Sequence, residues 1–204
     1  TVYMLYSDCS VCVPTAHTLK CMGCFGPLCS EMKCSAENNV CGAMTVTSYT
    51  GGSSNGIRIA HRSCATTHEC LQGSIHFLQW RAVITTKCCK SNLCNSKDAP
   101  DPPKAAPNGH KCFSCDKEGA CNKTLNCVGD EDHCVDVLVG QKTVILKGCV
   151  SKSFCLVDLR NIPALMDATM TCCQGEYCND GNAGNSQSAS LLLLATMLMY
   201  FLFI

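Results

Sequence analysis

The sequence lacks any long block of like charge. Its 204 residues include 16 Lys and Arg and 16 Asp and Glu, so the formal net charge is zero. A protein that binds nucleic acid by neutralising phosphates needs a basic patch or stripe, and the sequence has none. We therefore predict no nucleic-acid partner.

The sequence also lacks the residue spacings on which most metal and phosphate sites depend. Its six histidines are scattered, with no H-E-x-x-H motif, and no glycine-rich loop is followed by the Lys of a phosphate-binding loop. The acidic residues 130–133 lack the spaced oxygens of a calcium-binding loop and are typical of a solvated loop. We predict no metal and no cofactor, and we expect the histidines at the surface.

One catalytic motif is present in the sequence, but not in the structural setting that it needs. Residues 52–56 read G-x-S-x-G, the pattern that exposes a nucleophilic serine, here Ser54, on a strand-to-helix turn of a hydrolase sheet. We expect these residues at the tip of a hairpin, where a flexible glycine-rich turn explains them. The chain is therefore predicted not to be an enzyme, and a hydrolase that uses Ser54 is the enzymatic alternative.

Cysteine, in contrast, is abundant. The 22 cysteines make up more than a tenth of the 204 residues, a level typical of a disulfide scaffold. Because disulfides persist only in oxidising compartments, they indicate the secretory route. Zinc binding by the two C-x-x-C pairs, which begin at Cys21 and Cys112, is the alternative.

The cysteines form two copies of one ordered pattern. Each copy opens with C-x-x-C and closes with C-C-x-x-x-x-C-N. The gaps between neighbouring cysteines are 2, 4, 4, 6, 22, 5, 17, 0 and 4 residues in the first copy and 2, 5, 5, 6, 14, 5, 16, 0 and 4 in the second. Between the copies, residues 96–110 are rich in proline, which favours extended backbone, and cannot bury a core, so we predict a linker there.

Both copies resemble the three-finger domains of the lymphocyte antigen 6 and urokinase-receptor (Ly-6/uPAR) family, over about residues 19–179. The resemblance implies a small, all-β, disulfide-rich fold of two tandem three-finger (snake-toxin-like) domains. The predicted parts are a signal-peptide remnant (1–18), domain 1 (19–95), the linker (96–110), domain 2 (111–179) and a lipid-attachment signal (180–204).

Spacing alone leaves the disulfide connectivity open. The family pattern implies that the first cysteine pairs with the fifth, the second with the third, the fourth with the sixth, the seventh with the eighth and the ninth with the tenth. The resulting pairs are Cys21 with Cys41, Cys24 with Cys29, Cys34 with Cys64, Cys70 with Cys88, Cys89 with Cys94, Cys112 with Cys134, Cys115 with Cys121, Cys127 with Cys149, Cys155 with Cys172, and Cys173 with Cys178. The resemblance also implies that the side-chain amides of Asn95 and Asn179 hydrogen-bond the backbone of each opening strand.

The stretches between the cysteines read as hairpins. In domain 2, alternating valines at 135–139 and a second β-branched run at 143–146 flank Gly140 and Gln141, which predicts the second finger. In domain 1, residues 43–49 and 57–63 flank a glycine-rich tip, and residues 75–86 predict the third finger. Pro163 interrupts the third finger of domain 2, so residues 159–166 are expected to form a helical turn or a loop.

The last fourteen residues are uncharged and almost wholly apolar, which is shorter than the roughly 20 residues of a spanning helix. Small residues and a polar spacer precede them, as in a glycosylphosphatidylinositol (GPI) attachment signal. We predict attachment at Asn182, with Gly181, Gly184 and Asn185 as alternatives, and a single-pass helix as the alternative anchor.

Two further features concern processing. Residues 1–18 are expected to be removed as a signal peptide together with Cys9 and Cys12, and the alternative is that these two cysteines form an extra bridge in a retained arm. Asn122 begins an N-x-T sequon, and we predict that it carries an N-linked glycan.

Because no residue pattern supports catalysis or a metal site, binding to another protein is the function that remains. Aromatic residues and arginine dominate protein interfaces. The predicted ligand contacts are therefore Phe77, Trp80 and Arg81 on the third finger of domain 1 and Tyr49 near the tip of its second finger. The alternative for Trp80 is that it fills the small core. We predict a GPI-anchored protein of the outer leaflet that binds an extracellular or membrane protein, and the alternative is a secreted inhibitor resembling the two-domain phospholipase inhibitors of the same family.

Overall fold

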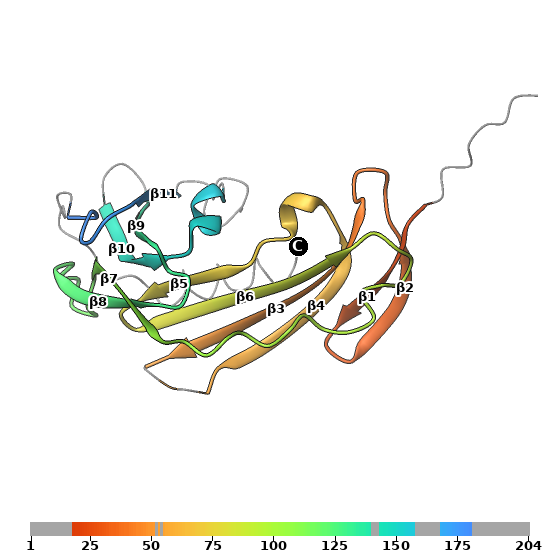
Figure 1. Ribbon diagram of the computed structural model, residues 1–204, viewed down its shortest axis with the longest axis horizontal. Coiled ribbons are helices and arrows are strands. Elements are labelled where there is room, and N and C mark those ends of the chain that lie inside the picture. Colours follow the sequence, from red (N-terminus) through yellow and green to blue (C-terminus); the bar gives the residue numbers. More distant parts are fainter. Residues whose placement is uncertain (1–17, 52, 54, 140–142, 158–167, 181–204) are drawn as a thin grey trace, which may run out of the picture.

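The computed structural model describes residues 18–51, 53, 55–139, 143–157 and 168–180 (Figure 1). The described chain is almost entirely β, with two short 3₁₀ turns at Thr67–Glu69 and Lys152–Leu156. Its strands are β1 (Lys20–Phe25), β2 (Leu28–Lys33), β3 (Val40–Thr50), β4 (Ile57–Ala65), β5 (Gly73–Phe77), β6 (Trp80–Cys89), β7 (Pro107–Ser114), β8 (Lys123–Val128), β9 (His133–Val139), β10 (Thr143–Val150) and β11 (Ala168–Cys173).

The hairpins predicted from β-branched runs are present. Antiparallel pairs join β3 with β4, β5 with β6, and β9 with β10. The two small domains are therefore of the three-finger type, as the sequence predicted. The region of Pro163 lies outside the described residues.

All ten predicted disulfides are present, with the pairing that the family pattern implies. The Asn95 amide accepts from the Met22 backbone N–H and donates to the Met22 and Gly42 carbonyls, each at 2.9 Å. Asn179 does the same for Phe113, at 3.0 Å in both directions. Both asparagines are buried, so each ties the end of its domain to its opening strand.

One sheet crosses the boundary between the domains. Nine strands follow the order β11-β9-β10-β5-β6-β3-β4-β1-β2, while β7 and β8 form a separate hairpin. The crossing is made by β5 of domain 1 and β10 of domain 2, where Ile75 lies opposite Val150 and Phe77 lies opposite Gly148. A Cβ atom on Gly148 would lie 2.1 Å from the His76 carbonyl oxygen, so this close approach requires glycine.

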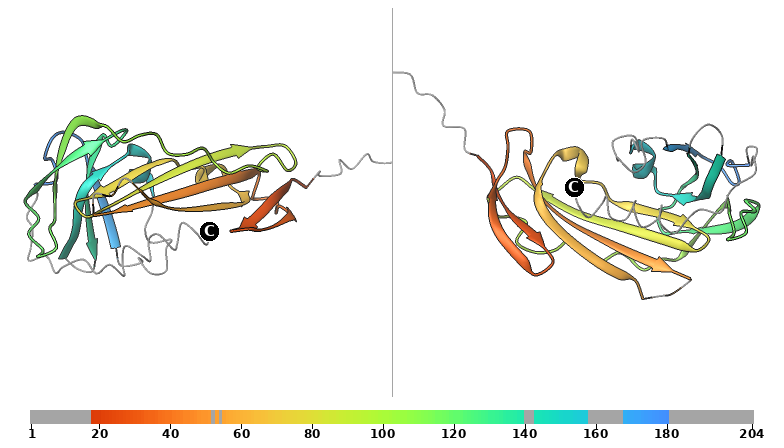
Figure 2. Two further views of the ribbon diagram at one scale, coloured as in Figure 1. Left: turned by 90° about the horizontal axis from the view of Figure 1, so that it is seen from below. Right: turned by 180° about the vertical axis from the view of Figure 1, so that it is seen from behind.

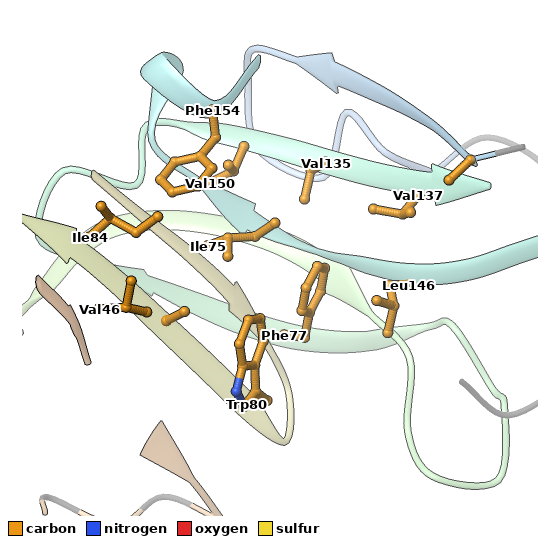
Figure 3. Close-up of a cluster of buried hydrophobic side chains, with 12 residues drawn as sticks. Val46, Ile75, Phe77, Trp80, Ile84, Val135, Val137, Leu146, Val150 and Phe154 are labelled. Atoms are coloured by element: carbon orange, nitrogen blue, oxygen red, sulfur yellow. The ribbon is translucent and has the colours of Figure 1, made fainter. Parts of the chain in front are cut away.

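The main apolar cluster also lies between the domains (Figure 3). It contains twelve buried residues, six from each domain: Val46, Ile75, Phe77, Trp80, Ala82 and Ile84 from domain 1, and Val135, Val137, Leu146, Val150, Phe154 and Ala168 from domain 2. The other two buried clusters, one in each domain, consist almost entirely of cystines. Each domain thus relies on disulfides for its own core, and the two domains share the apolar one.

The linker runs along domain 1, as Figures 1 and 2 show in green. Asp98 pairs with Arg62 at 2.8 Å and with Arg58 at 3.7 Å, and Thr85 donates to the Pro100 carbonyl at 2.6 Å. Ala99 is 4% exposed. Strand β7 begins inside the predicted linker, at Pro107. The proline-rich stretch is therefore fastened to the sheet instead of acting as a free spacer.

Candidate binding groove

A groove opens where the linker passes the finger tips of domain 1. Its volume is about 570 Å³, within the roughly 300–1,000 Å³ typical of ligand sites. It is lined by the second finger (Tyr49 and Ser53), the third finger (residues 76–81), the linker (residues 102–105) and Val128 of domain 2. The groove is therefore built from both domains and the segment that joins them.

All four predicted ligand contacts line this groove, but at different depths. Phe77 and Trp80 are 3% and 8% exposed, and their rings stack with centroids 6.1 Å apart. The Trp80 indole N–H donates to the Ser48 hydroxyl at 2.7 Å. These two rings form the buried floor and belong to the core that the domains share, so the alternative that Trp80 fills the core describes its position. Tyr49 and Arg81 are half-buried and lie nearer the opening.

Arg81 is held by a carboxylate from the other domain. Its Nε donates to the Glu131 Oε1 at 2.7 Å, and its guanidinium carbon lies 5.9 Å from the centroid of the Tyr49 ring. Such a contact between a cation and an aromatic face is attractive. Glu131 therefore fixes Arg81, which in turn contacts the ring of Tyr49.

Glu131 is completely buried, with four partners. Besides Arg81, its carboxylate oxygens contact the His76 Nδ1 at 3.1 Å, the Ser74 hydroxyl at 2.8 Å and the Val128 amide at 2.9 Å. Burial by itself raises the pKa of Glu131, but His76, Arg81 and the Val128 amide outweigh it and leave the pKa below its usual value. The carboxylate is therefore charged at neutral pH and locks β5 and β6 to domain 2.

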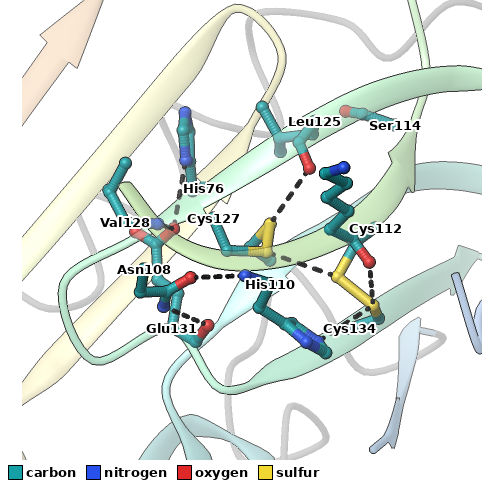
Figure 4. The surroundings of a disulfide bond; sticks show 12 residues. His76, Asn108, His110, Cys112, Ser114, Leu125, Cys127, Val128, Glu131 and Cys134 are labelled. Atoms are coloured by element: carbon teal, nitrogen blue, oxygen red, sulfur yellow. Dashed lines mark hydrogen bonds and ion pairs between the residues drawn. A yellow bond between two sulfur atoms is a disulfide. The ribbon is translucent and has the colours of Figure 1, made fainter. Parts of the chain in front are cut away.

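The prediction of a solvated acidic loop at 130–133 is wrong for Glu131, which is fully buried. The prediction of surface histidines is wrong for His76 and His133, whose side chains are 18% and 14% exposed, and for His61, whose ring nitrogens are buried. Figure 4 shows Glu131 and His76 near the Cys112–Cys134 disulfide, with the Asn108 side chain donating to the Glu131 carbonyl. Three adjacent acidic residues look like a solvent-facing run, and no pattern in the sequence singles out the middle one. Its burial depends on Arg81 and His76, which lie 50 and 55 positions away.

The zinc alternative does not fit the cysteines. Three groups of potential ligands come together in the described residues: Cys21, Cys34 and Cys64; His110, Cys112 and Cys134; and Cys112, Cys127 and Cys149. Every cysteine in these groups is in a disulfide, and a metal ligand needs a free thiolate.

Of the remaining predicted sites, the structure describes only Asn122. Asn122 is exposed in domain 2, directly before β8. Ser54 and Asn182 lie outside the described residues. Within the described chain, no helix combines the length and hydropathy needed to cross a membrane.

The fold defines a class, that of disulfide-rich, three-finger proteins. Residues 17–97 match the family model described as u-PAR/Ly-6 domain, and residues 110–179 match the one described as snake toxin and toxin-like protein. The chain belongs to the Ly-6/uPAR family, and residues 17–97 and 110–179 are two domains of this kind.

The similar proteins are receptors and an inhibitor. The chain is 28% identical over 155 residues to the urokinase plasminogen activator surface receptor of Mus musculus, covering 68% of this chain and 46% of the receptor. It is 29% identical over 146 residues to phospholipase A2 inhibitor LNF2 of Lachesis muta muta, covering 64% of this chain and 70% of the inhibitor. The chain thus spans about half the length of the receptors it matches.

A solved structure, mouse TEX101, is similar over 72% of this chain and 87% of its own, with 14% identity and a TM-score of 0.27. A score this low supports no comparison of how the domains are arranged.

Proposed function

We propose that this chain is a non-enzymatic cell-surface protein that binds a protein ligand or a neighbouring receptor through the groove. One observation carries the proposal: Tyr49 and Arg81, which the sequence predicts as interface residues, line the same groove, and the buried rings of Phe77 and Trp80 lie beneath it. Aromatic and arginine anchors in a partly desolvated site are typical of binding hot spots. Similarity to proteins named as receptors supports the same class.

The groove is suited to binding because its walls are fixed before a ligand arrives. The tip of the second finger is tied to the third by a hydrogen bond from the Gly51 amide to the Gln79 carbonyl at 3.1 Å. The third finger is tied to domain 2, since the Leu78 amide donates to the Ser114 hydroxyl at 2.9 Å. A preformed site avoids part of the entropic cost of ordering loops on binding.

Photo-crosslinking tests this proposal. We would replace Gln79, an exposed groove residue, by a photoreactive amino acid in the full chain on the surface of cells. The expected result is a crosslinked protein that is absent when the same amino acid replaces Lys90, which is exposed in domain 1 outside the groove. Equal labelling from both positions would argue against the groove as the binding site.

The location is a second part of the proposal. The segment 180–204 is a GPI-attachment signal in which Asn182 is the attachment residue, so the residues after Asn182 are exchanged for the anchor, and Asn122 carries a glycan. Treatment of intact cells with a phosphatidylinositol-specific phospholipase should release the protein into the medium. Retention would favour a spanning helix instead.

A secreted inhibitor is the second candidate function. It is favoured by the alignment with LNF2, which covers 70% of that inhibitor, against 46% of the mouse receptor. Protein found in the medium without phospholipase treatment, together with inhibition of a secreted phospholipase A2 by the purified protein, would favour this candidate.

A further inference from the structure

Two cationic side chains line the groove. Arg81 and Lys104 are among its lining residues, which include no Asp or Glu, and Glu131, which pairs with Arg81, is fully buried and does not line it. The surrounding domain is also basic, since residues 19–95 contain seven Lys and Arg against three Asp and Glu, whereas residues 111–179 contain seven against nine. A ligand that enters the groove therefore meets cationic side chains and no carboxylate among the residues that line it.

Arg81 can bind a second carboxylate. Glu131 uses only its Nε, and neither Nη atom has a hydrogen-bond partner among the described residues. The Arg81 side chain as a whole is 13% exposed, so the guanidinium is largely desolvated. A guanidinium whose position is already fixed by one carboxylate can pair with another at its free end, with little further loss of side-chain freedom.

Three further donors line the groove. Lys104 is exposed, and its ammonium group has no ion-pair partner in the described chain. The Tyr49 hydroxyl and the side-chain amide of Gln79 likewise have no hydrogen-bond partner among the described residues. The groove thus offers two cations and two neutral donors to one ligand.

The other walls are apolar. Leu78 is a large apolar residue that remains 38% exposed at the tip of the third finger. Pro102 and Pro103 face the same space from the linker. Apolar side chains can be buried on these walls beside the cations, which is a combination that favours a peptide segment over a simple anion.

We infer that the groove binds an extended, acidic segment of a partner protein, in which a carboxylate side chain stands next to an apolar one. The carboxylate pairs with the free end of Arg81 and with Lys104, and the apolar side chain packs against Leu78 and the two prolines. This inference rests on the proposed function and specifies the chemistry of its partner.

Peptide selection tests it. Cells that carry the full chain would be used to select phage from a library of random peptides, after depletion on cells that lack the protein. The expected result is enrichment of Asp and Glu beside aliphatic or aromatic residues. Lys104→Glu should reduce recovery of these peptides about fivefold, as expected when one exposed charge pair becomes a repulsion.

Lys90→Glu is the matched control, because it makes the same change in net charge on an exposed lysine of domain 1 outside the groove. Peptides without acidic enrichment, or equal losses with the two variants, would overturn the acidic partner and leave protein binding in place. Selection of no peptide at all would overturn the inference, and the Gln79 crosslink would then show whether protein binding fails with it.

Discussion

At the scale of single residues, Glu131 joins the core to the groove. It is a fully buried carboxylate of domain 2, and it binds Arg81 and His76 of domain 1 at 2.7 and 3.1 Å. Buried ion pairs contribute little relative to an apolar alternative, but removal of one member leaves the other desolvated and unpaired. The residue thus fixes how the domains dock and where Arg81 points.

We predict that Glu131→Gln lowers the free energy of unfolding by roughly 2–4 kcal/mol, because the Arg81 charge loses its buried partner. Chemical denaturation with the disulfides intact measures this. Glu118→Gln is the control, since Glu118 is exposed and only 3.7 Å from an exposed lysine. Equal stability of the two variants would show that the Glu131 carboxylate has no structural role.

His61 gives a second prediction. Neither ring nitrogen has a hydrogen-bond partner, and burial lowers the pKa of His61 more than the nearby Cys24 backbone raises it. The unfolded chain, titrating near about 6.5, then binds a proton that the folded chain does not. Stability should therefore be highest above this pH and decrease as the pH falls below it.

His61→Gln should reduce this loss of stability between about pH 7.5 and 5.5, measured from melting temperatures across the range. His68→Gln, at an exposed position, should leave it unchanged. A pH profile that is identical in the wild type and the His61 variant would contradict the prediction.

At the scale of elements, the fingers follow from local sequence and their docking does not. Alternation of β-branched residues at 135–139 and the glycine-rich tip at 51–56 predicted hairpins, because side-chain period and turn chemistry are local properties. The pairing of β5 with β10 depends on residues more than 70 positions apart, such as Ser74 and Ser151, whose backbone groups meet at 2.9 Å. No local pattern encodes that contact.

The groove, too, was predictable only in the parts that depend on local sequence. Tyr49 and Arg81 could be chosen because of their residue types, which are enriched at interfaces. Lys104 and Val128 were missed because they reach the groove only through the fastening of the linker and the docking of domain 2, and Glu131 was missed because that docking alone brings it to Arg81. The sequence therefore predicted the finger tips and not the surface that they share with their neighbours.

Gly148→Ala tests the joint between β5 and β10. The new methyl group would lie 2.1 Å from the His76 carbonyl oxygen, so the strands must separate or shift, at a cost of roughly 1–3 kcal/mol or more. We expect a lower melting temperature and weaker binding of groove ligands. Gly23→Ala is the control, since its nearest neighbour is the flexible end of Met32; similar effects of both changes would count against the joint.

At the scale of the whole molecule, the two domains share one sheet and one apolar core. Their shared core contributes twelve buried residues, six from each side, and the groove has walls from both domains. Domains of this size gain only a few kcal/mol from an apolar core of their own, and disulfides supply the rest. A shared apolar core gives both domains more stabilisation from buried apolar surface than either obtains from a core of its own.

Domain 1 alone, residues 19–95, should therefore fold around its five disulfides but expose the apolar face that domain 2 covers. We expect it to bind a hydrophobic dye and to self-associate, whereas the two-domain protein remains monomeric under the same conditions. An isolated domain 1 that is monomeric and binds no dye would mean that the shared core contributes little.

Hydrogen exchange at the joint tests the central claim most directly. The Ser151 amide donates to the Ser74 carbonyl at 2.9 Å, and the Ser74 amide donates to the Ser151 hydroxyl at 2.8 Å. If the domains form one body, these two amides exchange as slowly as those that pair β3 with β6 inside domain 1. If they exchange rapidly while the β3–β6 amides stay protected, the domains move independently, and the groove that depends on their docking is not a fixed site.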